Sequence, residues 1–326
     1  MNEALIVLQP GAPLTLERLG RRPRIVNGLV TNSLLSQAEW QEFDQAVVRM
    51  VRQKAVGYAR LRAAGLTHQL GGLGTLLSQW YVGSEHTTAN SNMDGRTRGD
   101  KDRGDRKLYG VPVPITFKEY EISLRELEAA RRLGNALDVF EAENAAEAVA
   151  DKQESMLFNG DTNIVVGGSA IYGLTTHSAR LTDTAANYGG GDFGTWGNGR
   201  KTLLGMISAL SANRYYGPFG VFVANTQYNQ LLGRATDGSG QTELDAIRTL
   251  PQIAFVEMGP KLADAATVMV QLTSNVIDIA VAQDITNLEW NSGDTMAAFF
   301  KVLAATIHRL KVDYAGNLGV CHATAC

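Results

Sequence analysis

The chain has 326 residues, of which 44% are hydrophobic and 19% charged, and its formal net charge is −3. This composition predicts a folded protein with one large or two modest cores and excludes general disorder. The near-neutral charge also argues against a dedicated nucleic-acid binder, whose surface would be basic. Neither a basic leader sequence nor an apolar run near the roughly 18 residues that span a bilayer is present, so we expect neither a signal peptide nor membrane association.

The first residues predict an extended arm followed by a helix. Residues 1–33 contain three prolines and a basic cluster. This cluster could contact phosphates non-specifically, or it could lie in a solvated arm or form salt bridges to a neighbour; its members are Arg18, Arg21, Arg22 and Arg24. Ser36 and Glu39 then form a capping box, and the apolar spacing beyond it predicts an amphipathic helix to about residue 62.

Residues 76–124 predict a two-stranded arm with a charged tip. Its strands are expected at Leu76–Val82 and Leu108–Leu124, and Pro112 and Pro114 keep one edge of the second strand from central pairing. Such an arm is rarely stable alone and needs a surface to lie on. Interleaved charges in the loop suit salt bridges that set the register with a neighbouring subunit. We predict contacts there from Arg96, Arg98, Asp100, Lys101, Asp102 and Arg103.

The strongest single element is a predicted helix from about residue 137 to 158, with a narrow alanine-rich face. A second row consists of carboxylates spaced by four, four and three: Glu143, Glu147, Asp151 and Glu154. Because like charges in such a row repel, we expect it to face water or a basic partner. A di-metal site is disfavoured, since no histidine lies on this helix.

The rest of the chain follows an α+β pattern. Residues 161–199 are expected to be irregular, and a strand pair is expected between residues 288 and 312. Helices are predicted at 200–214 and 226–234, and strands at 219–225, 253–258, 267–272 and 276–282.

Two motifs resemble chemical sites, but their spacing is wrong. Gly194–Thr202 (GTWGNGRKT) approaches a phosphate-binding loop, yet Arg200 precedes Lys201 and no buried strand leads into it. The only cysteines lie in CHATAC, where Cys321, His322 and Cys326 lack a fourth metal ligand and the terminus is expected to fray. Two cysteines also exclude a disulfide framework and fit synthesis in a reducing cytoplasm. We predict no metal, no cofactor and no enzymatic activity.

The order of these parts resembles the major capsid proteins of tailed bacteriophages and the related encapsulins, which share the Hong Kong 97-type fold. VPVPITFKEYEISLRELEAARR is similar to the returning strand of the family's extended loop, or E-loop, and ALDVFEAENAAEAVADKQESMLFNG to its spine helix. IYGLTTH resembles the segment after the spine, and GPFGVFVANTQYNQLL the strand and helix of the axial domain. The resemblance covers about residues 36–322 and rests on patterns and element order.

This resemblance implies an α+β fold in four parts. They are an N-terminal arm with the first helix (1–57), an E-loop (58–118), a peripheral domain with the spine helix (119–190 and 283–326) and an axial domain (191–282). It implies no catalytic residues, and subunits that form pentamers and hexamers of an icosahedral shell, with the E-loop lying over a neighbour. Head-to-tail contacts of this kind close into rings and shells.

We predict a structural protein: the major capsid subunit of a bacteriophage virion, assembled in the host cytoplasm and enclosing double-stranded DNA without specific contacts. Scaffold, portal and decoration proteins are further expected partners. The first alternative is an encapsulin shell around enzyme cargo; the arm before Ser36 disfavours it, because encapsulins usually begin near a cargo-docking helix. The second is a soluble α+β enzyme that binds phosphate at Gly194–Thr202.

Overall fold

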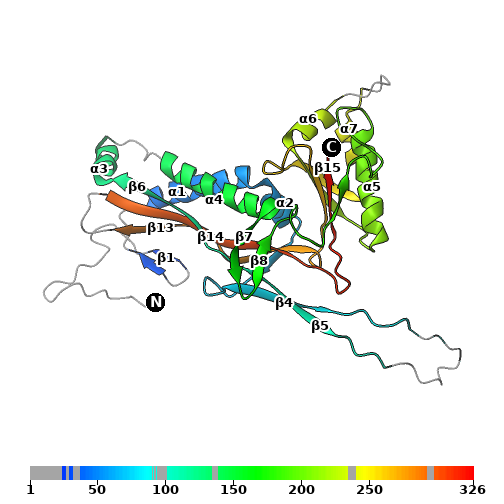
Figure 1. Cartoon of the computed structure of the whole chain (residues 1–326). Helices are drawn as coiled ribbons and strands as arrows, with labels where there is room; N and C mark the ends of the chain where they lie inside the picture. Colours follow the sequence, from blue (N-terminus) through cyan, green and yellow to red (C-terminus); the bar gives the residue numbers. More distant parts are fainter. Residues whose placement is uncertain are drawn as a thin grey trace. The chain divides into compact units, whose positions relative to one another are not determined.

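The computed structural model describes residues 24–26, 29–31, 37–89, 91, 93, 101–133, 139–233, 240–291 and 297–326. The chain divides into two compact units, which are drawn with their elements in Figure 1. Unit 1 comprises Met1–Ala55, Ile115–Lys152 and Gln283–Ala305, and unit 2 comprises Val56–Pro114, Gln153–Ala282 and Thr306–Cys326.

Unit 1 packs helices against an antiparallel strand pair. Its elements are β1 (Arg24–Val26), β2 (Leu29–Thr31), α1 (Gln37–Lys54), β6 (Thr116–Ser123), α3 (Leu124–Leu133) and the first part of α4 (Phe140–Asn159). Strand β6 pairs with β14 (Ala297–Leu310), from Ala297 opposite Ser123 to Ala304 opposite Thr116.

An aromatic cluster holds this core together. The Phe300 ring of β14 stacks on Phe43 of α1 at 6.0 Å and on Tyr120 of β6 at 5.1 Å between centroids, and it meets Trp40 edge-on at 6.1 Å. Alanines of α4, among them Ala142 and Ala146, are fully buried in the same cluster. The alanine face therefore lets the backbone of α4 approach the core closely, which explains the narrow apolar stripe in the sequence.

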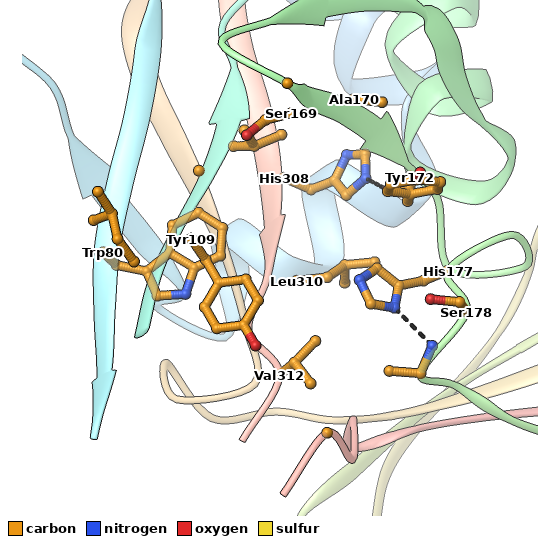
Figure 2. A pocket seen from close by; sticks show the side chains of 16 residues that line it. Trp80, Tyr109, Ser169, Ala170, Tyr172, His177, Ser178, His308, Leu310 and Val312 are labelled. Atoms are coloured by element: carbon orange, nitrogen blue, oxygen red, sulfur yellow. Dashed lines mark hydrogen bonds between the residues drawn. The ribbon is translucent and has the colours of Figure 1, made fainter. Parts of the chain in front are cut away.

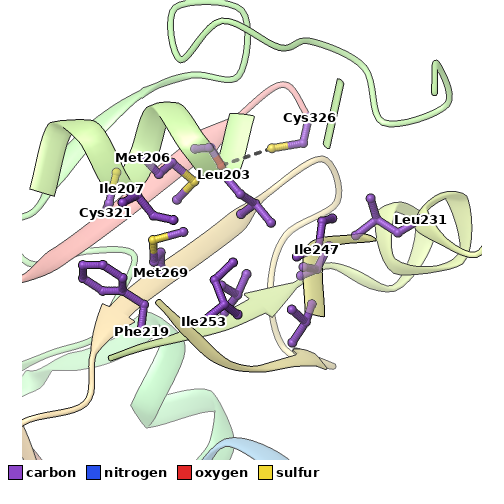
Figure 3. Close-up of a cluster of buried hydrophobic side chains, with 14 of the residues drawn as sticks. Leu203, Met206, Ile207, Phe219, Leu231, Ile247, Ile253, Met269, Cys321 and Cys326 are labelled. Atoms are coloured by element: carbon purple, nitrogen blue, oxygen red, sulfur yellow. Dashed lines mark hydrogen bonds between the residues drawn. The ribbon is translucent and has the colours of Figure 1, made fainter. Parts of the chain in front are cut away.

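Unit 2 contains a five-stranded mixed sheet with the order β11-β10-β12-β15-β9. The strands are β9 (Leu181–Thr184), β10 (Phe219–Val223), β11 (Ile253–Met258), β12 (Thr267–Gln271) and β15 (Val320–Thr324). Helix α5 (Asn198–Ala212) presents Leu203, Met206 and Ile207 to this sheet (Figure 3). The short helices α6 (Asn225–Leu231) and α7 (Glu243–Arg248) complete the core through Leu231 and Ile247.

Unit 2 also contains several smaller elements. They are α2 (Val56–Ala63), β3 (Thr67–Gln69), the antiparallel pair β7 (Gly160–Val166) and β8 (Ser169–Tyr172), and the hairpin of β4 (Leu77–Gly83) and β5 (Arg106–Pro112). Strand β3 pairs in parallel with residues 279–281 of β13 (Ile277–Asn291). Strands β13 and β14 belong to a sheet with the order β3-β13-β14-β6.

The long helix, α5, α6 and the strands from β10 to β12 lie where the sequence predicted them, to within a few residues. Two predicted elements are divided instead. The helix expected from 36 to 62 is interrupted at Ala55, and the strand expected from 108 to 124 breaks between β5 and β6, next to Pro112 and Pro114. Because β6 pairs with β14 rather than β4, the two-stranded arm is shorter than predicted.

The prediction of an irregular segment at 161–199 was wrong in part, since β7, β8 and β9 lie there. The expectation of a frayed C-terminus was also wrong. Strand β15 lies between β12 and β9, Cys321 is fully buried and Cys326 is 6% exposed. The last residues are therefore part of the core of unit 2.

Candidate functional site

The hairpin formed by β4 and β5 is the candidate functional element (Figure 1). Its register runs from Leu77 opposite Pro112 to Gly83 opposite Arg106, and a 22-residue loop, residues 84–105, joins the strands. Alternating side chains point to opposite faces of such a ribbon. The two faces therefore have to be considered separately.

One face of the hairpin contacts the rest of unit 2, and the other leaves large side chains in solvent. Ser78 is 3% exposed on the inner face, whereas Tyr81 is 69% and Leu108 51% exposed on the outer face. Leu76, just before β4, is 70% exposed. Clustered exposed apolar side chains are typical of a surface that a partner covers.

The inner face is anchored at the root of the hairpin by a buried ionic network. The guanidinium of Arg309 donates to both carboxylate oxygens of Asp278 and, through Nη1, to the Ser78 hydroxyl at 3.2 Å. Lys311 Nζ donates to the same carboxylate at 2.7 Å. The Trp80 ring stacks on Tyr109 across the strands at 6.4 Å and lies 5.8 Å from the Arg309 guanidinium. Strand β4 thus contacts the network directly, and β5 is linked to it through the stack of Tyr109 on Trp80.

Weaker contacts follow further along the hairpin. The Lys107 ammonium donates to the Tyr314 carbonyl at 3.3 Å and lies 4.1 Å from the centre of that ring. Beyond β4, Arg214 pairs with Glu85 at 3.0 Å, and both side chains are largely exposed. Because solvent screens such exposed pairs, the root supplies the firmest attachment.

The tip residues predicted from the sequence divide into two groups. Arg96, Arg98 and Asp100 lie outside the described residues, whereas Lys101, Asp102 and Arg103 are exposed in the loop. Inter-subunit contacts of these six residues stay a prediction.

Within the loop, Asp102 accepts a hydrogen bond from the Thr87 backbone N–H at 2.7 Å, and this bond holds the pKa of the carboxyl below its usual range. Ser84 and Asp105 also join the two sides of the loop, with N–H to O distances of 2.8 and 3.0 Å. Asp102 therefore joins the two sides of the loop in addition to contributing a negative charge at its surface.

The predicted arm contacts are only partly within the described residues. Arg24 begins β1, where it lies opposite Thr31 of β2. Arg18, Arg21 and Arg22 lie outside the described residues. The contacts of this basic cluster stay a prediction.

The carboxylate row of α4 faces basic side chains of its own chain. Glu143 pairs with Arg49, and Glu147 pairs with Lys54 at 2.6 Å, so α1 supplies the basic partner. Further along, within unit 2, the buried Glu154 accepts hydrogen bonds from the Gly57 and Tyr58 N–H groups at 2.7 and 3.4 Å. Glu154 therefore does not face water, one of the two surroundings expected for the row, and its carboxylate caps the start of α2.

The phosphate-loop motif is already occupied by a carboxylate. Glu243 of α7, 2% exposed, accepts hydrogen bonds from the N–H groups of Gly197 at 3.0 Å and Arg200 at 2.8 Å. These donors lie at the N-terminus of α5, where a phosphate would have to bind. Lys201 is exposed. The geometry therefore does not favour phosphate binding at Gly194–Thr202.

The cysteines of the CHATAC motif are buried in the core of unit 2. Burial raises the pKa of the Cys321 thiol to about 12 and that of Cys326 to about 11, so both thiols are protonated near neutral pH. No group of three His, Cys, Asp or Glu side chains within the described ranges has metal-binding geometry.

A pocket of about 440 Å³ lies beside the hairpin root (Figure 2). Trp80 and Tyr109 line one side, and Tyr172, His177 and His308 line another. His308 Nε2 donates to the Tyr172 carbonyl at 2.7 Å, and burial lowers the pKa of the ring to about 4. His308 is therefore a neutral, buried group that supports the wall of the pocket.

Comparison with known proteins agrees with this architecture. The sequence is 26% identical over 278 residues to the type 1 encapsulin shell protein EncA of Myxococcus xanthus (strain DK1622), covering 85% of this chain and 90% of that protein. The virus-like particle from Pyrococcus furiosus matches 87% of this chain and 98% of its own, with 17% identity and a TM-score of 0.55. The capsid of Myoviridae phage XM1 matches 82% and 92%, with 20% identity and a TM-score of 0.55.

The hairpin, the long α4 helix and the mixed sheet of unit 2 therefore define the class: this protein has the Hong Kong 97-type fold of phage capsid and encapsulin shell subunits. Within that class the chain belongs to a family of unknown function, DUF6260, which matches residues 30–323. In the part of the chain that the structure describes, no helix has the length and apolarity needed to cross a membrane.

Proposed function

We propose that this chain is a self-assembling shell subunit, whose copies form pentamers and hexamers of a closed icosahedral particle. The exposed outer face of the hairpin carries this proposal. Tyr81 and Leu108 contribute little to the core of unit 2, and a two-stranded ribbon is at best marginally stable alone. A neighbouring subunit would cover this face and remove its apolar side chains from water.

Two versions of this function differ in what the shell encloses. The first is a phage head that encloses double-stranded DNA, with scaffold, portal and decoration proteins as further partners. The likeness to the capsid of Myoviridae phage XM1 supports this version. The second is an encapsulin-type compartment with protein cargo, which the 26% identity to an encapsulin shell protein supports. In both versions the role is structural and needs no catalytic residue.

The test is electron microscopy of the protein after size exclusion, expressed alone and together with its neighbouring genes. We expect uniform hollow shells or ring-shaped capsomers. A homogeneous monomer or dimer in both preparations would contradict the proposal. Nuclease-protected double-stranded DNA inside the shells would favour the phage head, whereas a stoichiometric co-purifying enzyme would favour the encapsulin.

A further inference from the structure

We propose that Arg309 is the positioning residue of the hairpin, because its guanidinium fixes the orientation of β4 and β5 within unit 2. The positioning of the hairpin within one subunit does not depend on the proposed function. Its consequence for shell assembly rests on that function. Arg309 lies on β14 and Asp278 on β13, while Ser78 and Trp80 lie on β4. One side chain thus joins the hairpin to two other strands.

The geometry of this contact is directional. Arg309 Nε lies 2.6 Å from Oδ1 and Nη2 2.5 Å from Oδ2 of Asp278, a bidentate pair whose side chains are each 5% exposed. Such a fork fixes the plane of the guanidinium. The remaining nitrogen, Nη1, then donates to the Ser78 hydroxyl, and the Trp80 ring lies beside the same group. The Asp278 fork therefore orients the group that the hairpin contacts.

The charges in this network show which substitution can test the positioning of the hairpin without unfolding the subunit. Asp278 carries one negative charge and accepts hydrogen bonds from two cations, Arg309 and Lys311. Removing Arg309 leaves Asp278 paired with Lys311, so no buried charge loses its partner. Removing Asp278 would leave two cations without their shared anion, which strongly destabilises a protein. Arg309→Met is therefore the variant that tests positioning.

A purely structural role predicts a different result. If Arg309 only filled space or balanced charge, Arg309→Met would affect the whole of unit 2 equally, and Arg309→Lys would restore it. If Arg309 positions the hairpin, β4 and β5 respond more than the five-stranded sheet. Arg309→Lys then restores little, since an ammonium cannot form the fork and reach Ser78 together.

The experiment is hydrogen exchange of β4 and β5, with β10 as internal reference, on the subunit fraction separated from shells by size exclusion. We expect Arg309→Met to speed exchange in the hairpin about 10-fold or more, the loss expected for a hydrogen bond to a charged group, with β10 unchanged. Ser78→Ala, which removes only one hydroxyl, should speed it about 3-fold and keeps the test valid if Arg309→Met fails to fold. Lys301→Met, on the same strand and paired with Glu119, is the matched control and should leave the hairpin unchanged.

Electron microscopy of the same variants shows whether they still assemble into shells. Fast hairpin exchange together with few or misshapen shells supports the whole inference. Fast exchange with normal shells supports the positioning role but contradicts the proposed use of the hairpin in assembly. Exchange like that of the wild type in both Arg309→Met and Ser78→Ala would overturn the inference, whatever the shells look like.

Discussion

The hairpin and the five-stranded sheet are both β-structures of unit 2, yet they place their large side chains in opposite environments. In the sheet, Phe219, Met269 and Cys321 are fully buried under α5 (Figure 3). In the hairpin, Tyr81 and Leu108 are more than half exposed. Because hydrophobic stabilisation follows the apolar area removed from water, the sheet stabilises the subunit itself. The hairpin leaves its apolar area in solvent, where the proposed function places a neighbouring subunit.

The largest expected effect on the subunit is a truncation in the sheet. Phe219→Ala removes a fully buried ring at the start of β10 and should lower the free energy of unfolding by about 3–5 kcal/mol. Denaturant unfolding followed by circular dichroism measures it. A loss below about 1 kcal/mol would mean that the sheet does not carry the stability assigned to it.

Acid should weaken the region beneath the hairpin root next most strongly. The pKa of His308 is about 4 in the folded chain and near 6.5 when exposed, so between these values the unfolded state binds more protons. Stability is therefore fully present above pH 6.5 and falls by roughly 3 kcal/mol as the pH drops to about 4. Denaturant titrations across this range measure the loss.

The control for this acid effect is a pair of histidine variants. His308→Gln should remove that part of the pH dependence, and His68→Gln, at an exposed position of β3, is the matched substitution for comparison. Equal curves for His308→Gln and the wild type would show that this ring is not the source.

A smaller effect is expected at the start of α5, which covers the sheet. Glu243→Ala leaves the Gly197 and Arg200 N–H groups without their acceptor and should cost about 2 kcal/mol of unfolding free energy. Glu243→Gln keeps one acceptor oxygen and should lose less. If phosphate bound and stabilised either the wild type or the variants, the structural reading of this motif would fail.

The smallest effect on the subunit should come from the hairpin surface. Tyr81→Ser replaces a side chain that is 69% exposed, so the unfolding free energy should change by less than about 0.5 kcal/mol. The yield of shells should nevertheless fall. Tyr216→Ser, at a position 68% exposed outside the hairpin, is the matched control. Equal assembly of the two variants would contradict a special role for the hairpin.

Much of this organisation could be predicted from local patterns. The long helix was predictable because its alanine face repeats over many turns, and α4 lies at Phe140–Asn159. The hairpin was predictable because two apolar runs flank a charged loop. Strands β7 and β9 were missed because most of their side chains are exposed, so they lack the alternation that marks a strand.

The side-chain contacts between elements could not be predicted, because they join residues far apart in the sequence. At the hairpin root, Ser78 and Arg309 are separated by 231 positions, and between α4 and α1, Glu143 and Arg49 are separated by 94. No local spacing connects such residues. Their pairing depends on the strand order and register of the folded chain, which a single sequence does not specify at this level.

The most direct test of the central claim, that the hairpin joins subunits rather than stabilising its own, is electron microscopy of a deletion of Asn90–Asp105 beside the wild type. This change shortens the loop beyond β4 and leaves both hairpin strands in place. We expect the variant to unfold with the wild-type free energy and to form few or incomplete shells. Normal, equally stable shells from the deletion variant would contradict the account.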